Sequence, residues 1–135
     1  HSQQIGFQYD LYTWEQHLIQ GRLVLIPKEQ QSKPGNYASM PLAMHLQGGK
    51  RYHLFMRFKI QTESQWLNLH IKEAGSKRLQ IIHRHKVQPN DAKEWVTISK
   101  DFVPNNDIYS EFMVGAMQIA GEGRFLAIDY IYITD

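Results

Sequence analysis

Two stretches in the middle of the chain alternate apolar and polar residues almost without interruption. In residues 51–61 one parity is apolar and the other is mostly polar, and residues 66–72 repeat the pattern. Successive side chains of a strand point to opposite faces of a sheet, so each stretch predicts a β-strand with one buried face. The predicted core residues are Tyr52, Leu54, Met56, Phe58, Leu67, Leu69 and Ile71.

Turn residues separate the remaining apolar runs, as at Pro104–Asp107 and Gly121–Gly123. Such signals recur roughly every ten residues, a spacing typical of successive strands in a sandwich. The segment Leu11–Gln20 has no clear alternation, and we expect a turn or a short helix there. The chain as a whole therefore predicts an all-β fold, an antiparallel β-sandwich of about nine strands.

The last apolar run contains a break in parity. Leu126 and Ile128 share one parity, whereas Ile131 and Ile133 share the other. A regular strand cannot bury all four side chains on one face. One extra residue at Asp129-Tyr130, a β-bulge, would bring all four to the same face, and we predict it there.

Composition narrows the class of protein. The 135 residues fit one domain, spanning 1–135, which we expect to be part of a larger protein. Net charge is only +2 and no basic cluster occurs, which argues against a nucleic-acid partner. No run approaches the roughly 20 apolar residues of a membrane span, so we expect no membrane insertion. Cysteine is absent, so neither disulfides nor thiolate metal sites are expected.

The polar parity of the two alternating stretches is unusual for a solvated sheet face, because it combines aromatic rings, imidazoles and cations without a carboxylate. Aromatic planes stack on sugar rings, while amide and guanidinium groups reach hydroxyls and carboxylates. Guanidinium groups would favour an acidic sugar. The alternative is that Phe55 and Trp66 pack under a loop and the charges are merely solvated. The predicted ligand-binding residues are His53, Phe55, Arg57, Trp66, Asn68 and His70.

Several motifs resemble those of galactose-binding-like β-jelly-rolls, the group that includes carbohydrate-binding modules of families 4, 9 and 22. Gly6-Phe7-Gln8 followed by Trp14 resembles their opening strand. The segment from Gly48 to Leu54 resembles the entry to their central strand. Trp95, Phe102-Val103-Pro104 and the run from Gly123 to Ile133 resemble their closing strands. The order and spacing of these motifs cover nearly the whole chain.

The resemblance implies a jelly roll that binds a polysaccharide or oligosaccharide across one sheet face and performs no catalysis. It also implies attachment to other domains of an extracellular or cell-envelope (periplasmic) protein. Such modules commonly hold a structural Ca²⁺ between the opening and final strands, where Asp129 matches an expected ligand and Gln8 replaces a glutamate. Because calcium prefers charged oxygens, we expect no required cofactor and at most a weak calcium site.

Catalysis, metal binding and a structural role are the alternative interpretations of the sequence. No catalytic motif, such as a nucleophile elbow, a phosphate loop or a zinc-binding His-Glu pair, occurs in the chain. His83 and His85 share a face and would make a metal pair, but no third ligand is identifiable. The competing function is a structural or protein-interaction β-sandwich of a multidomain enzyme or sensor, without a sugar site of its own. Fold alone does not decide between the two functions.

Overall fold

The computed structural model describes residues 2–4, 14–19, 22–27, 38–41, 45–72, 79–108, 111–116 and 123–135. The strands in these ranges are β1 (Ser2–Gln4), β2 (Trp14–Ile19), β3 (Arg22–Pro27), β4 (Ala38–Pro41), β5 (Tyr52–Gln61), β6 (Trp66–Lys72), β7 (Leu79–Lys86), β8 (Val96–Phe102), β9 (Glu111–Ala116) and β10 (Phe125–Thr134). A short 3-10 helix, η2 (Pro89–Ala92), lies between β7 and β8. No helix in the described ranges has the length and apolar character that a bilayer span requires.

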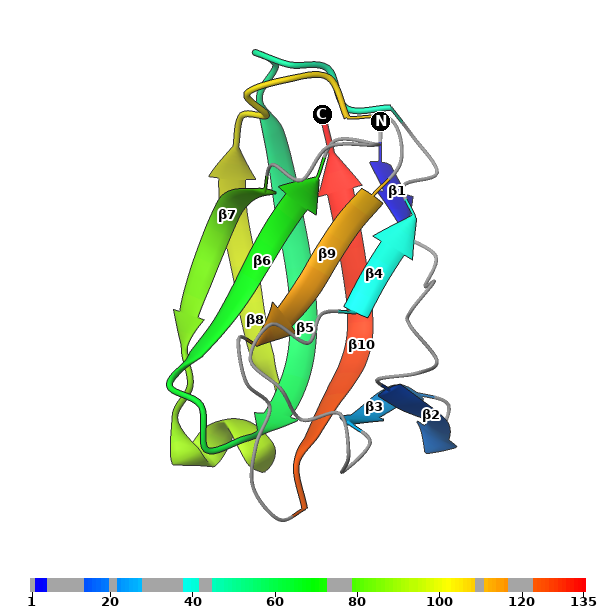
Figure 1. Ribbon diagram of the computed structural model, residues 1–135, viewed down its shortest axis with the longest axis vertical. Helices are drawn as coiled ribbons and strands as arrows, with labels where there is room; N and C mark the ends of the chain where they lie inside the picture. Colours follow the sequence, from blue (N-terminus) through cyan, green and yellow to red (C-terminus); the bar gives the residue numbers. More distant parts are fainter. Residues whose placement is uncertain are drawn as a thin grey trace.

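The strands form two sheets that pack face to face. One sheet, here the β5 sheet, has the order β2-β3-β10-β5-β8, and β1 pairs with the end of β10. The other, the β6 sheet, has the order β4-β9-β6-β7. Figure 1 shows the β6 sheet in front of the β5 sheet, with both chain ends at the same end of the molecule. All pairings between the described strands are antiparallel, which confirms the predicted all-β sandwich.

The described core between the sheets is built mainly by alternate side chains of β5, β6, β8 and β10. On β5 the buried side chains alternate with partly exposed ones along its whole length. The predicted core residues are all confirmed, since none of them exceeds 3% exposure. Among the described residues, Phe58 is the largest side chain that is fully buried. Burial of apolar area is the main favourable contribution to folding, so this layer holds the two outer faces in place.

The predicted bulge in β10 is confirmed. Ile128 pairs with Phe58, and Tyr130 pairs with the next residue along β5, Arg57, so Asp129 is the extra residue. Leu126, Ile128, Ile131 and Ile133 are all buried in the core. On the other side of β10, the partner changes from β3 before the bulge to β1 after it.

The segment Leu11–Gln20 was expected to form a turn or a short helix, and this expectation is wrong for the part that the structure describes. Trp14–Ile19 is the strand β2, which pairs residue for residue with β3. Pairing satisfies the backbone hydrogen bonds of this segment in a way that its local sequence does not reveal.

β7 and β8 are the last strands of their sheets and lie on the same side of the molecule (Figure 1). Polar side chains of β7 make hydrogen bonds along this edge. Gln80 on β7 donates from Nε2 to the carbonyl of Val103 at 2.8 Å, and its Oε1 accepts from the backbone N–H of Asn105 at 2.7 Å. His85 lies with one ring nitrogen 2.7 Å from a carboxylate oxygen of Asp91. Hydrogen bonds at this edge therefore link β7 to the segment that follows β8 and to η2.

Candidate functional site

The six predicted ligand-binding residues do not form one surface. β5 belongs to one sheet and β6 to the other, and the polar parity of each strand faces away from the shared core. His53, Phe55 and Arg57 therefore lie on the outside of the β5 sheet. The prediction of a single face is wrong, because alternation distinguishes inside from outside but does not reveal which sheet a strand joins. The other three residues, Trp66, Asn68 and His70, lie on the outside of the β6 sheet.

On the β6 sheet, a residue that was not predicted completes the group. Arg84 on β7 is the cross-strand partner of Asn68, and its Nε donates to Asn68 Oδ1 at 3.1 Å. The guanidinium carbon of Arg84 lies over the Trp66 ring, 4.4 Å from the ring centroid. We call Trp66, Asn68, His70 and Arg84 the Trp66 face.

Two polar residues of the Trp66 face are buried although they point away from the core. Asn68 is 3% exposed and His70 is 4% exposed. Burial disfavours the charged imidazole and lowers the pKa of His70, so the ring is neutral at pH 7 and carries both a donor and an acceptor nitrogen. On the neighbouring strand β9, Gly115 lies opposite Asn68 and adds no side chain at that position. The Trp66 face thus contains a neutral, buried polar pair beside an indole and a guanidinium.

On the outside of the β5 sheet, a second group forms around Trp95, which was also not predicted as a site residue. Lys59 Nζ lies 4.8 Å from the centroid of the Trp95 ring, and the guanidinium carbon of Arg57 lies 5.4 Å from it. Phe55 is 36% exposed, and its ring contacts that of His53 with 4.4 Å between centroids. We call His53, Phe55, Arg57, Lys59 and Trp95 the Arg57 face.

His53 is held by two neighbours on β8. Its Nδ1 contacts the carboxylate of Asp101, and its Nε2 lies 2.6 Å from the hydroxyl of Ser99. Hydrolytic triads use the same order of groups. Here, however, Ser99 is exposed on the open face of a sheet, whereas nucleophilic sites lie in cavities that exclude water. The contacts of His53 instead fix the ring against Phe55.

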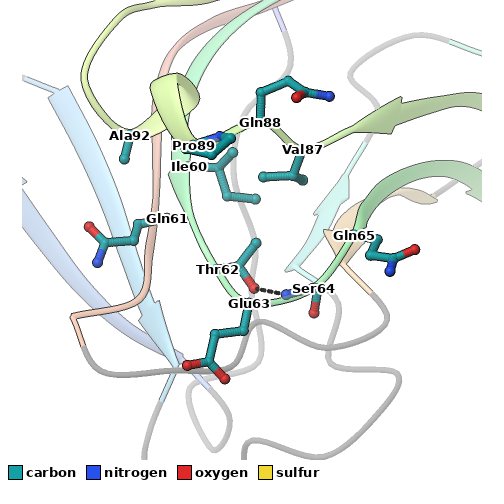
Figure 2. Close-up of a pocket in the computed structure, with 10 residues that line it drawn as sticks. All are labelled: Ile60, Gln61, Thr62, Glu63, Ser64, Gln65, Val87, Gln88, Pro89 and Ala92. Carbon is teal, nitrogen blue, oxygen red and sulfur yellow. Dashed lines mark hydrogen bonds between the residues drawn. The ribbon is translucent and has the colours of Figure 1, made fainter.

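A depression at one end of the sandwich is separate from both faces (Figure 2). Its volume is about 310 Å³. Figure 2 shows its wall formed by the β5–β6 connection, where Thr62 Oγ1 accepts from the backbone N–H of Ser64 at 3.0 Å, and by the start of η2. Its polar side chains are amides, hydroxyls and one carboxylate, and none of its lining residues is an aromatic that could stack on a sugar. The lining residues are Ile60, Gln61, Thr62, Glu63, Ser64, Gln65, Val87, Gln88, Pro89 and Ala92.

Asp129, the predicted calcium ligand, takes part in an ion pair. Its carboxylate oxygen lies 3.6 Å from a terminal nitrogen of Arg57. The described residues contain no group of three or more histidine, cysteine or acidic residues that could hold a metal ion. A cation so close to Asp129 does not fit a calcium site, which is favoured by several charged oxygens. Gln8 lies outside the described residues, so calcium binding there stays a prediction.

His83 and His85 lie at the edge between the two sheets. The ring of His85 meets Phe58 edge-on, with 5.3 Å between centroids, in addition to its contact with Asp91. Burial lowers the pKa of His83, and the charges of Lys100 and His85 lower it further. Such surroundings are typical of side chains that close the edge of a sandwich. Among the described residues, no further ligand supports a metal site at His83 and His85.

Comparison with known proteins gives structural matches only. No protein-family model and no curated protein sequence matches the chain. A family 29 carbohydrate binding module matches with a TM-score of 0.66 and 11% identity, covering 98% of this chain and 88% of the module. BiXyn10A CBM1 matches with a TM-score of 0.64 and 14% identity, covering 100% and 92%. The C-terminal CBM6 of LamC, a marine laminarinase from Zobellia galactanivorans, has a TM-score of 0.64 and 17% identity, covering 100% of both chains.

These matches define the fold. The chain has the antiparallel β-sandwich fold of carbohydrate-binding modules, which confirms the predicted resemblance at that level. The matching modules are a CBM29, a CBM1 and a CBM6, whereas the motifs resemble those of families 4, 9 and 22. At such low identity the likeness says nothing of the ligand, which must be argued from the two faces.

Proposed function

We propose that this chain is a non-catalytic glycan-binding module and that its Trp66 face binds an acidic polysaccharide. The module would belong to a larger extracellular or cell-envelope protein and would hold that protein on its polymer. The observation that carries the proposal is the convergence of Trp66, Arg84 and Asn68 on the outside of the β6 sheet. The fold shared with carbohydrate-binding modules supports it.

The chemistry of the Trp66 face suits a sugar acid. The indole offers an apolar plane of the kind on which C–H faces of pyranose rings stack. Arg84 uses its Nε to bind Asn68, which fixes the plane of the guanidinium and directs its terminal nitrogens away from that bond. A guanidinium oriented in this way can hold a carboxylate or a sulfate through two parallel hydrogen bonds.

The proposal is tested by a glycan array that includes uronic-acid and sulfated polymers, followed by calorimetry on a polyuronate and a neutral glucan. We expect Trp66→Ala to weaken binding of the neutral glucan roughly 30-fold or more and to remove the polyuronate site of this face, because aromatic and arginine anchors dominate most interfaces. Arg84→Ala should weaken binding of the polyuronate more than that of the glucan. Added salt should likewise weaken only polyuronate binding, since salt screens exposed charges beyond about 10 Å at 0.1 M.

Lys93→Ala is the matched control, because it removes one exposed positive charge beside η2, away from the Trp66 face. It should leave affinity unchanged, and circular dichroism should show that all three variants are folded. Absence of binding to every polymer, or binding insensitive to Trp66→Ala, would contradict the proposal. Such a result would favour the competing function, a structural or protein-interaction domain.

A further inference from the structure

The Arg57 face is left unexplained by a single glycan site on the opposite side of the sandwich. Its side chains do not contribute to the core, because they project from the outward parity of β5. If this face only met solvent, the fold would not require Trp95 to lie against two cations or Phe55 to expose a third of its surface to water. Exposed aromatic and cationic groups gathered in one place indicate an interaction surface.

The Arg57 face is a stripe along one strand. His53, Phe55, Arg57 and Lys59 are alternate residues of β5, so they stand in line on the same side of the sheet. With about 3.3 Å per residue, the line from the first to the last extends about 20 Å. Trp95 directly precedes β8, and its ring contacts both Arg57 and Lys59 and so restricts the direction of the two cations. A straight row of this length suits a linear polymer.

The charges of the stripe select an anion. Asp129 accompanies Arg57, whereas no carboxylate of the described residues lies within 4.0 Å of Lys59 Nζ. The Trp95 ring attracts the two cations through its π-face and holds them side by side without neutralising them. An acidic group placed between Arg57 and Lys59 would meet both donors. Phe55 offers an apolar plane beside them.

We propose that the Arg57 face is a second glycan-binding surface, which takes an acidic polysaccharide with its carboxylate or sulfate groups against Arg57 and Lys59 and a sugar ring against Phe55. This surface is independent of the Trp66 face, because the core and both sheets separate the two. One sugar chain lying flat on one face does not reach the other. The module therefore bridges two polymer chains, a consequence that rests on the proposed function of the Trp66 face.

The test is calorimetry of the whole chain with a short oligouronate and a neutral oligoglucan, using Trp66→Ala, Lys59→Glu and the double variant. Lys100→Glu is the matched control: it reverses an exposed lysine on β8, in the same sheet, but its charge lies near His83 and not on the Arg57 face. We expect two oligouronates per wild-type chain and one per Trp66→Ala chain, bound by the Arg57 face. In the Trp66→Ala background, Lys59→Glu should weaken the remaining oligouronate site roughly fivefold or more, and oligoglucan binding much less. Arg57→Gln provides a second variant of the same surface.

Bridging gives an independent readout. Wild-type protein mixed with a long polyuronate should form large particles in light scattering, and either single variant should bind the polymer without forming them. The proposal is overturned if Lys59→Glu and Lys100→Glu are indistinguishable in stoichiometry and affinity, as they would be if this face contacts another domain of the parent protein. It is also overturned if Lys59→Glu weakens oligoglucan binding as much as oligouronate binding. A failure of the function proposed for the Trp66 face would give a different result, because Trp66→Ala would then leave the wild-type stoichiometry unchanged.

Discussion

Deleting one residue from the bulge in β10 should preserve the fold, whereas deleting two residues should disrupt it. Asp129 is the extra residue between the pairs Ile128–Phe58 and Tyr130–Arg57. Deleting Asp129 alone preserves both pairs and keeps every later side chain on its present face. Deleting Tyr130 as well places Ile131 opposite Arg57, on the outside of the sheet, and each following side chain changes face with it.

The magnitudes follow from what each deletion removes. The single deletion removes an ion pair with 3.6 Å between Arg57 and Asp129, and partly exposed pairs contribute ~0–1 kcal/mol. The double deletion transfers Ile131 and Ile133, each 1% exposed, from the core to water. Burial of such a side chain contributes ~1.5–3 kcal/mol, so exposing both costs ~3–6 kcal/mol. That loss is comparable with the ~5–15 kcal/mol total stability of a typical domain.

Urea unfolding monitored by tryptophan fluorescence separates the two variants. The single-deletion variant should unfold cooperatively, with a midpoint close to that of the wild type. The double-deletion variant should unfold at a much lower urea concentration or fail to fold. Equal destabilisation by the two deletions would refute the parity argument, and so would a double-deletion variant of nearly wild-type stability.

Two further predictions concern stability. Leu69→Ala, at a fully buried position of β6, should cost ~2–5 kcal/mol, whereas Leu79→Ala, at a leucine 42% exposed on the neighbouring strand, should stay within ~0.5 kcal/mol in the same urea assay. Because burial lowers the pKa of His70, the unfolded chain binds a proton there more readily than the folded one, and stability should fall as pH drops below ~6.5. His70→Gln should flatten this dependence in urea titrations between pH 7 and 5, and an unchanged slope would contradict it.

Local alternation was sufficient to predict the core and the bulge. Leu54 and Met56 on β5, like Leu69 on β6, are buried as the parity required. The bulge was predictable because Ile128 and Ile131 cannot otherwise share a face, and the core offers no other place for them. Both inferences use only residues close in sequence, and side-chain direction within a strand is fixed locally.

The site could not be predicted in the same way, because it depends on which strands pair. The connection from β5 to β6 crosses from one sheet to the other, and nothing in the two alternating patterns distinguishes this crossing from a hairpin. Arg84 could not be placed opposite Asn68 by regular counting along the β6–β7 pair, because the register of this pair shifts between Leu69 and His70. Trp95 could not be placed either, because β8, the strand that follows it, pairs with a strand far away in the sequence.

The Trp66 face and the Arg57 face are formed by different strands on opposite sides of the sandwich, so their similarity carries information about function. Neither Trp66 nor Trp95 belongs to the buried core, and each has at least one cation over its ring. An exposed contact of this kind contributes only ~0.5–1 kcal/mol to stability, much less than one buried leucine. Packing therefore gives little reason for the same arrangement on both sides of the sandwich, whereas recognition of an acidic sugar by each face accounts for both with one chemistry.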